Sequence, residues 1–325
     1  MIGLLVAVKL AVVKTGGQAA AELTYTNMRS TRLPLLLTLA CGCCWAQAPQ
    51  PDGGGVRPGE LPKSWRTGGP TCDDAPEWEI HAYNPDLYIL RENGCVNYEK
   101  PFLYLFFGSE KAFLIDTGAG ETHVASAVSG VIDEWAMRNH RQPPPLIVGH
   151  SHSHDDHIAG DAQFRARANT TVVPLTVEAT MKTFDIAHWP DGVGKIDLGG
   201  RVLDVVPIPG HDVLSVAYYD RQTGILDAGD SLYPGRLYVH DFPSFVASTK
   251  RLVGFTDGKI VTHIVGCHIE QARTPYLDYK VGTKYQPDEH SLDMGRGELL
   301  ELNDALARMK TPVRMAFRDF TIWPQ

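Results

Sequence analysis

The chain has 325 residues, of which 43% are hydrophobic and 21% are charged. This length suits one or two domains with a substantial buried core. The share of hydrophobic residues excludes a chain that is too polar to fold. The formal net charge of −8 at pH 7 argues against a partner with a phosphate backbone, so we expect no nucleic-acid binding. The sequence leaves the oligomeric state open.

The N-terminal part has the order of an export signal. A basic start at residues 28–32 precedes an apolar run that ends in the cleavage-like sequence Ala46-Gln47-Ala48. We therefore predict that residues 1–48 are an upstream segment plus a signal peptide at about 28–48, and that the mature protein is periplasmic or secreted without stable membrane insertion. The 27 residues before the signal are interpreted as an upstream extension, with an added membrane anchor as the alternative. Lipoprotein anchoring through one of the three cysteines at 41–44 is less favoured, because none has leucine three residues before it.

Cleavage after Ala48 would remove four basic side chains and one acidic one and take the net charge from −8 to −11. Cys72, Cys95 and Cys267 would remain. In an oxidising compartment, we expect a Cys72–Cys95 disulfide with Cys267 unpaired. Three buried free thiols are the alternative, because sequence separation does not fix the distance between Cα atoms.

Residues 49–70 are rich in proline and glycine and are predicted to form a flexible leader, followed by a single domain over 71–325. Apolar and polar residues alternate over 86–120 around two turn signals, which predicts antiparallel strands. Residues 121–139 then predict a helix. Its apolar positions are Val124, Val128, Val131, Ile132, Trp135 and Met137.

A short buried strand is predicted at "PPLIVGHSH", residues 144–152, and it enters a polar cluster. Residues 195–230 again alternate as strands do. A helix over 242–255, a strand over 259–266 and an amphipathic helix over 297–310 complete the order. This order predicts an α+β fold in which helices pack outside two mixed β-sheets.

The polar cluster, "GHSHSHDDHIAG" at residues 149–160, holds four histidines and two aspartates. Residues two apart share one face of an extended segment, so any two of His150, His152 and His154 could chelate a metal. Only the register that begins at His152 gives the pattern H-x-H-x-D-H, because the register that begins at His150 fails at the aspartate.

This hexapeptide, "HSHDDH", resembles the signature of the metallo-β-lactamase superfamily. Further elements follow the family order at strand ends: Asp116 in "FLIDTG", His211 in "PIPGHD", Asp230 in "LDAGD" and His268 in "IVGCH". The resemblance covers about Leu87 to Gln271. It implies the metallo-β-lactamase fold, a four-layer αββα sandwich of two mixed sheets with outer helices.

The resemblance also implies two metal sites. The ligands would be His152, His154 and His211 for the first site, Asp156, His157 and His268 for the second, and Asp230 as a bridge. Nitrogen and oxygen donors without a thiolate suit Zn²⁺, with two ions expected per chain, and are also compatible with iron or manganese. His150, Asp155 and Asp116 are expected to support the ligands. His268 is preferred to His263 as the last ligand, and Cys267 is expected to be a small buried residue, with a thiol beside the metal as the alternative.

Two such ions would lower the pKa of a shared water so that hydroxide forms near neutral pH, and no protein nucleophile would be needed. Asp156 or Asp230 would orient this hydroxide and pass its proton to the leaving group. We predict Tyr233 as a third catalytic residue that contacts the developing oxyanion, with Arg236 and Tyr238 in the same loop. The alternative is that these three are ordinary packing or surface residues.

Asp230 stands where β-lactamases of this superfamily typically have Cys or Ser, so the chain is more similar to glyoxalase II, lactonase and phosphodiesterase relatives. Its C-terminal part leans acidic, unlike the basic region with which glyoxalase II enzymes bind glutathione. The expected function is an exported dinuclear zinc hydrolase acting on a carboxylic ester, lactone or amide of a small molecule, a β-lactam included. The alternatives are a single-iron sulfur-dioxygenase-like oxidoreductase and a non-catalytic metal-binding protein.

Overall fold

The computed structural model describes residues 55–66, 68–72 and 75–325. The expected signal peptide and residues 49–54 of the expected leader lie outside these ranges. The described part of that leader lies against the domain: Trp65 is buried, and the backbone N–H groups of Arg57 and Glu60 donate to the carbonyls of Gln222 and Tyr83. Within the described ranges, no helix is both long and apolar enough to cross a bilayer.

Three sheets organise the described chain. The first, in strand order, contains β1 (Trp78–Asn84), β2 (Leu87–Glu92), β3 (Phe102–Phe107), β4 (Ala112–Ile115), β5 (Leu146–Gly149) and β6 (Thr170–Val172). The second, in strand order, contains β12 (His263–Val265), β10 (Ile225–Asp227), β9 (Val216–Asp220), β8 (Val202–Pro207) and β7 (Gly194–Asp197). A small third sheet contains β11 (Arg236–Val239), β14 (Thr321–Pro324) and β13 (Met315–Ala316).

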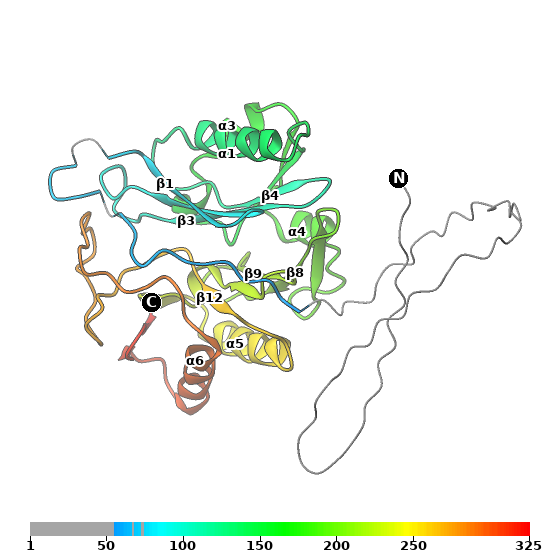
Figure 1. Cartoon of the computed structure of the whole chain (residues 1–325). Coiled ribbons are helices and arrows are strands. Elements are labelled where there is room, and N and C mark those ends of the chain that lie inside the picture. The colour runs from blue at the N-terminus through cyan, green and yellow to red at the C-terminus, as the bar shows by residue number, and fades with distance from the viewer. Residues whose placement is uncertain (1–54, 67, 73–74) are drawn as a thin grey trace, which may run out of the picture. The chain divides into compact units, whose positions relative to one another are not determined.

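The helices are α1 (Val124–Arg138), α2 (Asp155–Ile158), α3 (Asp161–Ala166), α4 (Val177–Phe184), α5 (Phe242–Thr256) and α6 (Arg296–Arg308), with a 3-10 turn η1 (Gly229–Ser231). Four of them cover the outer faces of the two larger sheets (Figure 1), whereas Met181 and Phe184 of α4 pack into the core between the sheets. Helices α1 and α3 lie on the first sheet, and α5 and α6 lie on the second. Both sheets contain parallel and antiparallel pairs. The predicted α+β architecture of four layers is therefore confirmed.

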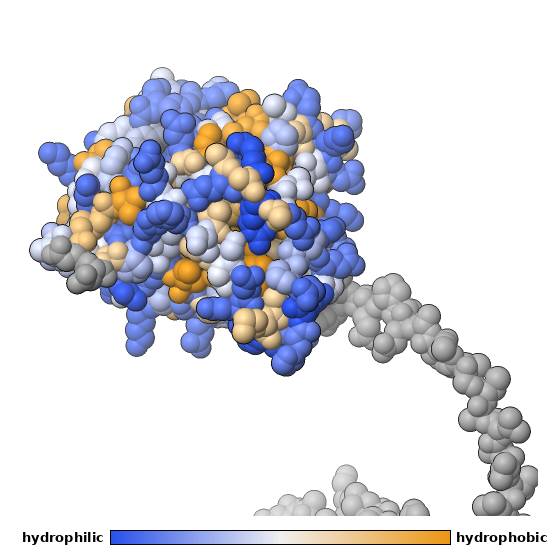
Figure 2. Space-filling view, turned by 90° about the horizontal axis from the view of Figure 1, so that it is seen from above, coloured by the Kyte–Doolittle hydropathy of each residue, from blue (hydrophilic) through white to orange (hydrophobic). Residues whose placement is uncertain are grey.

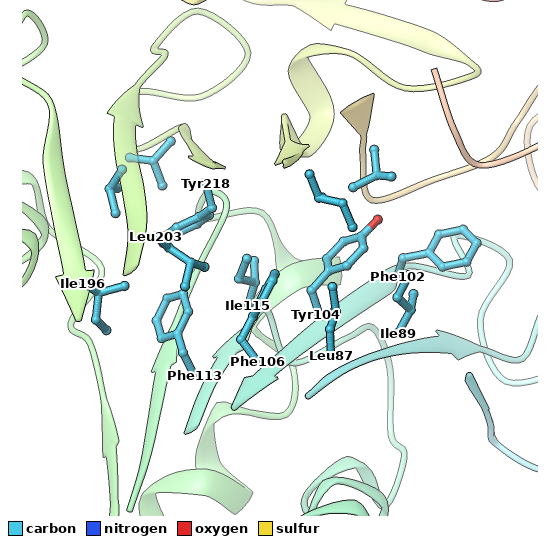
Figure 3. Packing of buried hydrophobic residues seen from close by; sticks show 14 of the residues in the cluster. Leu87, Ile89, Phe102, Tyr104, Phe106, Phe113, Ile115, Ile196, Leu203 and Tyr218 are labelled. Carbon is cyan, nitrogen blue, oxygen red and sulfur yellow. The ribbon is translucent and has the colours of Figure 1, made fainter. Parts of the chain in front are cut away.

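The layer between the two sheets is a continuous apolar core (Figure 3). Phe113, from β4, lies against Tyr218 of β9, and the Tyr104 hydroxyl, from β3, reaches across the layer and donates to the carbonyl of Gly266 after β12. The alternate residues of β2 and β3 pack on the other face against α1. Both faces of these strands are thus covered, which is why their sequences are almost entirely apolar.

Helix α1 shows where the sequence pattern was accurate and where it was not. Its predicted apolar positions are buried except Met137, which is 76% exposed, and Ala136 is buried instead. With about 100° of rotation per residue, position 137 lies far around the helix from Trp135 and faces solvent.

The surface seen from above Figure 1 is mainly hydrophilic, with separate small hydrophobic patches (Figure 2).

A disulfide joins Cys72 and Cys95, whose Cα atoms lie 5.5 Å apart. Cys267 is a free, buried thiol. The predicted pairing is therefore confirmed over the alternative of three free thiols.

Strand direction determines where the predicted site residues meet. Strands β4 and β5 run parallel in the first sheet, and β10 and β12 run parallel in the second. Strand β8 is antiparallel to β9, as is β10, so β8 also ends at the edge where β10 ends. The segments that follow β4, β5, β8, β10 and β12 therefore emerge near one another, whereas β9 ends at the opposite edge.

Candidate metal centre

Three histidines from two strand ends converge at one point. His152 and His154 follow β5, and His211 follows β8. The Nδ1 atom of His154 lies 3.0 Å from His152 Nε2 and 3.1 Å from His211 Nε2, and the two Nε2 atoms are 3.3 Å apart. We call these three residues the histidine group.

A second set of donors lies beside the first and contains Asp156, His157, Asp230 and His268. The Nε2 atoms of His157 and His268 lie 3.3 Å apart, and they lie 3.3 and 3.2 Å from Asp156 Oδ2. Helix α2 begins at Asp155, so Asp156 and His157 come from its first turn, while His268 follows β12. We call these four residues the acidic group.

A single oxygen, Asp230 Oδ2, lies between the two groups. It is 3.9 Å from His152 Nε2 and 3.7 Å from His211 Nε2 on one side. On the other side it is 3.7 Å from His157 Nε2 and 3.4 Å from His268 Nε2. One carboxylate is thus placed to serve both groups.

The partners of the imidazoles determine what the converging atoms can bind. His211 Nδ1 donates to the carbonyl of Tyr238 at 2.7 Å, and His268 Nδ1 donates to the carbonyl of Glu99 at 2.9 Å. His157 Nδ1 donates to Asp116 Oδ2 at 2.9 Å. In a neutral imidazole the other nitrogen then carries a lone pair, so several lone pairs point at the same small volumes.

This arrangement fits metal ions. Donor atoms of a four-coordinate zinc site, with bonds of about 2.0–2.1 Å, lie roughly 3.3 Å apart, as most of these atoms do. Lone pairs that face one another repel unless a cation lies between them. In addition, Asp230 Oδ1 is buried without a hydrogen-bond partner.

Asp116 supports this centre from behind, as predicted. Its carboxylate also accepts from the backbone N–H and the hydroxyl of Ser151, both at 2.7 Å, which ties the end of β4 to the segment after β5. The Ser151 hydroxyl in turn lies 3.0 Å from His152 Nδ1. Asp116 has φ 66°, in the left-handed region, so the backbone is constrained where the carboxylate must meet both His157 and Ser151.

The electrostatic surroundings of the two groups differ. Burial lowers the pKa of His152 well below its ordinary value and also lowers that of His211. Burial alone would lower the pKa of His157 and His268 too, but the neighbouring carboxylates raise both well above the ordinary value. The acidic group therefore favours positive charge.

The remaining predicted residues lie outside the converging set. His150 Nε2 bonds Asp161 Oδ1 at 2.8 Å, and Asp155 is exposed. His263 lies within β12, 3.7 Å from Asp293 Oδ2. The buried Cys267 thiol lies 3.4 Å from Asp116 Oδ2 on the far side of the His157 ring from the other donors.

A cavity of about 150 Å³ opens onto the acidic group, and three of its residues were not singled out from the sequence: Glu99, His240 and Glu270. Tyr233 also lines it, but its hydroxyl donates to the backbone carbonyl of Arg236 and lies 3.1 Å from Glu270 Oε2. The single hydroxyl hydrogen is therefore used within the protein. For Tyr233 the structure departs from the prediction of a donor to the oxyanion.

Tyr238 has the free hydrogen that Tyr233 lacks. Its hydroxyl accepts from Arg236 Nε at 3.0 Å, and Tyr238 is among the residues that line the same cavity. The expected loop here is in fact strand β11, in which alternate residues share a face. Tyr238 and His240, which directly follows β11, both line the cavity, with His240 5.9 Å from His154 between ring centroids.

Known proteins share this sequence pattern. The Metallo-beta-lactamase superfamily profile matches residues 101–263. The acyl-coenzyme A thioesterase MBLAC2 of Bos taurus is 26% identical over 59% of this chain and 81% of its own length. A hydroxyacylglutathione hydrolase of Cereibacter sphaeroides is 31% identical over 39% of this chain and 51% of its own length.

Solved structures are also similar. A metallo-beta-lactamase from Pontibacter korlensis has a TM-score of 0.49 and 19% identity, over 71% of this chain and all of that one.

The family profile spans half of the chain and includes most of the converging donors. The chain thus belongs to the metallo-β-lactamase superfamily and is a metal-dependent hydrolase.

Proposed function

We propose that this protein is a dinuclear zinc hydrolase that cleaves small acyl thioesters and related carboxylic esters, lactones or amides, β-lactams included. The observation that carries the proposal is the convergence of seven donors into two groups that share Asp230 Oδ2. The relatives support the thioester, because they include an acyl-coenzyme A thioesterase and a hydroxyacylglutathione hydrolase.

The histidine group would hold one ion, the acidic group would hold the second, and Asp230 would contact both. Bound there, the ions would supply the lowered pKa of water and the polarised substrate carbonyl that hydrolysis needs. Only nitrogen and oxygen atoms belong to the two groups, which is the donor chemistry of zinc and of several other divalent ions.

The protein's own groups would handle protons and charge. Burial alone would raise the pKa of Asp156, but its interaction with His157 lowers it below the ordinary value, so this carboxylate stays ionised. A carboxylate with a lowered pKa is a weak base, so Asp156 would orient the attacking water by accepting a hydrogen bond and would not store its proton. Tyr238 can donate its free hydroxyl hydrogen to the oxygen of the substrate carbonyl, where negative charge develops.

We also infer that the protein is exported. The order of residues 28–48 supports this, as does the Cys72–Cys95 disulfide, because disulfides persist mainly in oxidising compartments. Expression of the full chain with fractionation tests it. We expect a soluble periplasmic or secreted product that begins near Pro49, and an uncleaved protein in the cytoplasm would contradict export.

A substrate panel tests the hydrolase. We would assay the zinc-loaded protein with a thioester, an oxygen ester, a lactone and a β-lactam. The matched variants are His268→Ala in the acidic group and His263→Ala, five residues earlier and outside it. We expect thioester hydrolysis that falls at least about a thousandfold in the first variant, equivalent to about 4 kcal/mol of barrier, and changes little in the second. A zinc-loaded protein that hydrolyses none of the four would overturn the proposal.

A further inference from the structure

A second, larger hollow of about 490 Å³ opens beside the histidine group. His154, His211 and His240 line it, and the same three residues line the cavity at the acidic group. The hollow therefore adjoins the metal centre, and a molecule bound in it contacts two of the converging histidines, His154 and His211.

Part of the lining of the hollow is apolar. It is formed by Trp189, Pro190, Pro209 and Val213. Trp189 is half-buried and packs against the core between the sheets, whereas Val213 is 64% exposed. Apolar side chains left open beside a polar reaction centre are typical of a ligand pocket.

Hydrogen bonds hold both sides of the hollow in place. On the Trp189 side, Asp191 Oδ1 accepts from Arg251 of α5 at 2.7 Å. On the other side, the Ser248 hydroxyl donates to the carbonyl of Pro209 at 2.7 Å. The carbonyl of Gly210 accepts the backbone N–H of His240 at 3.0 Å, which joins the His211 loop to the end of β11. The hollow is thus formed before any ligand binds.

Charge indicates which part of a substrate would fit. Apart from the histidines, the charged residues that line the hollow are Asp212 and Asp241. Carboxylates repel an anionic group, while the apolar part of the lining stabilises a hydrocarbon. The hollow therefore suits the uncharged acyl part of a substrate better than a charged carrier.

We propose that this hollow, which we call the acyl groove, binds the hydrocarbon chain of the substrate's acyl group and places its carbonyl carbon at the metal centre. The proposal rests on the proposed function and deepens it, because it makes the protein selective for medium-length acyl chains over acetyl. Trp189 and Val213 are the residues that would determine this preference.

The test compares straight-chain acyl thioesters from two to ten carbons with one constant thiol. We expect kcat/KM to rise about fourfold for each added methylene until the groove is filled, as burial of a methylene in an apolar site predicts. Val213 is exposed, so Val213→Asp should leave the fold intact. Its loss of kcat/KM relative to the wild type should be small for the acetyl thioester and should grow with each added carbon. Trp189→Ala should flatten the same increase. Met137→Ala on α1, also exposed and far around the fold in another layer, should keep the wild-type dependence.

A binding measurement separates failure of the groove from failure of the proposed function. Calorimetry would use uncleavable S-(2-oxoalkyl) thioethers with short and long chains. Tighter binding of the long chain, weakened by Val213→Asp, would support the groove even if no thioester is hydrolysed. Hydrolysis with equal kcat/KM for all chain lengths, or binding that is indifferent to chain length, would overturn the acyl groove and leave the hydrolase proposal standing.

Discussion

The histidine group and the acidic group lie side by side, yet they differ in charge and in what lies behind them. In the first, the partners behind the imidazoles are neutral, a hydroxyl behind His152 and a carbonyl behind His211, and Asp230 is the carboxylate in front of them. In the second, two carboxylates join the imidazoles and a third, Asp116, stands behind His157.

The difference teaches that the same ligand type is tuned by its neighbours. Burial lowers the pKa of His152, while carboxylates overcome burial and raise the pKa of His157. We therefore expect the acidic group to attract cations more strongly and to exchange more protons when they bind. The variants below test whether the two groups behave as separate sites joined by Asp230.

The largest effect should come from Asp230→Ala, which removes the oxygen placed between both groups. We expect kcat/KM to fall at least about a thousandfold, about 4 kcal/mol, because both ions lose a ligand. The measurement is kcat/KM at saturating zinc together with the metal content. Activity within about tenfold of the wild type would show that Asp230 does not bridge.

The two groups can be broken one at a time with His154→Ala and Asp156→Asn. Each variant should keep about one ion per chain, because the undamaged group retains its own donors. Elemental analysis after exhaustive dialysis gives the count. If both variants kept two ions, or if each lost both, the division into two groups would be refuted.

The support behind the ligands can be tested with Asp116→Asn and Asp161→Asn, two buried carboxylates that each bond a histidine. Asp116 holds His157, which belongs to the acidic group, and Asp161 holds His150, which does not. We expect about a 10- to 100-fold loss of zinc affinity in the first variant, as is typical of residues that orient a ligand, and a smaller loss in the second. Equal losses would mean that His150 matters to the centre as much as His157.

The smallest effect concerns stability. Burial raises the pKa of Glu92 to about 8, and its Oε1 atom has no hydrogen-bond partner. Because the folded pKa exceeds the unfolded one, the stability that Glu92 contributes is complete below about pH 4.5 and is lost as the pH rises toward 8 and beyond. In the metal-free protein, Glu92→Gln should therefore lose less stability than the wild type between pH 5 and 9. Denaturation midpoints of both proteins at several pH values measure this. If the two midpoints changed by the same amount with pH, the prediction would be contradicted.

Much of the centre could be predicted because its residues follow strands in short, regular spacings. His152, His154, Asp156 and His157 are close in sequence, so one register placed all four. Asp230 and His268 each follow a short apolar strand, and parallel strands bring such ends to one edge. The family resemblance assigned His211, Asp230 and His268 to the same centre, and the shared strand edges explain physically why these residues converge.

Other residues depend on distant partners that no local pattern indicates. Residues 236–239 were expected to be a loop, but they pair with β14, more than 80 residues later. The aromatic and branched residues of "RLYV" are a weak strand signal that could have drawn attention to Tyr238 and His240. The orientation of the Tyr233 hydroxyl depends on Glu270, and that of Trp189 depends on how its loop packs against the core.

A zinc titration of the metal-free protein, with thioester hydrolysis followed in the same samples, tests the central claim most directly. The account predicts that metal content rises to two zinc ions per chain and that activity becomes complete only as the second ion binds. One bound iron per chain with oxygen uptake, or two bound zinc ions without hydrolysis, would contradict it.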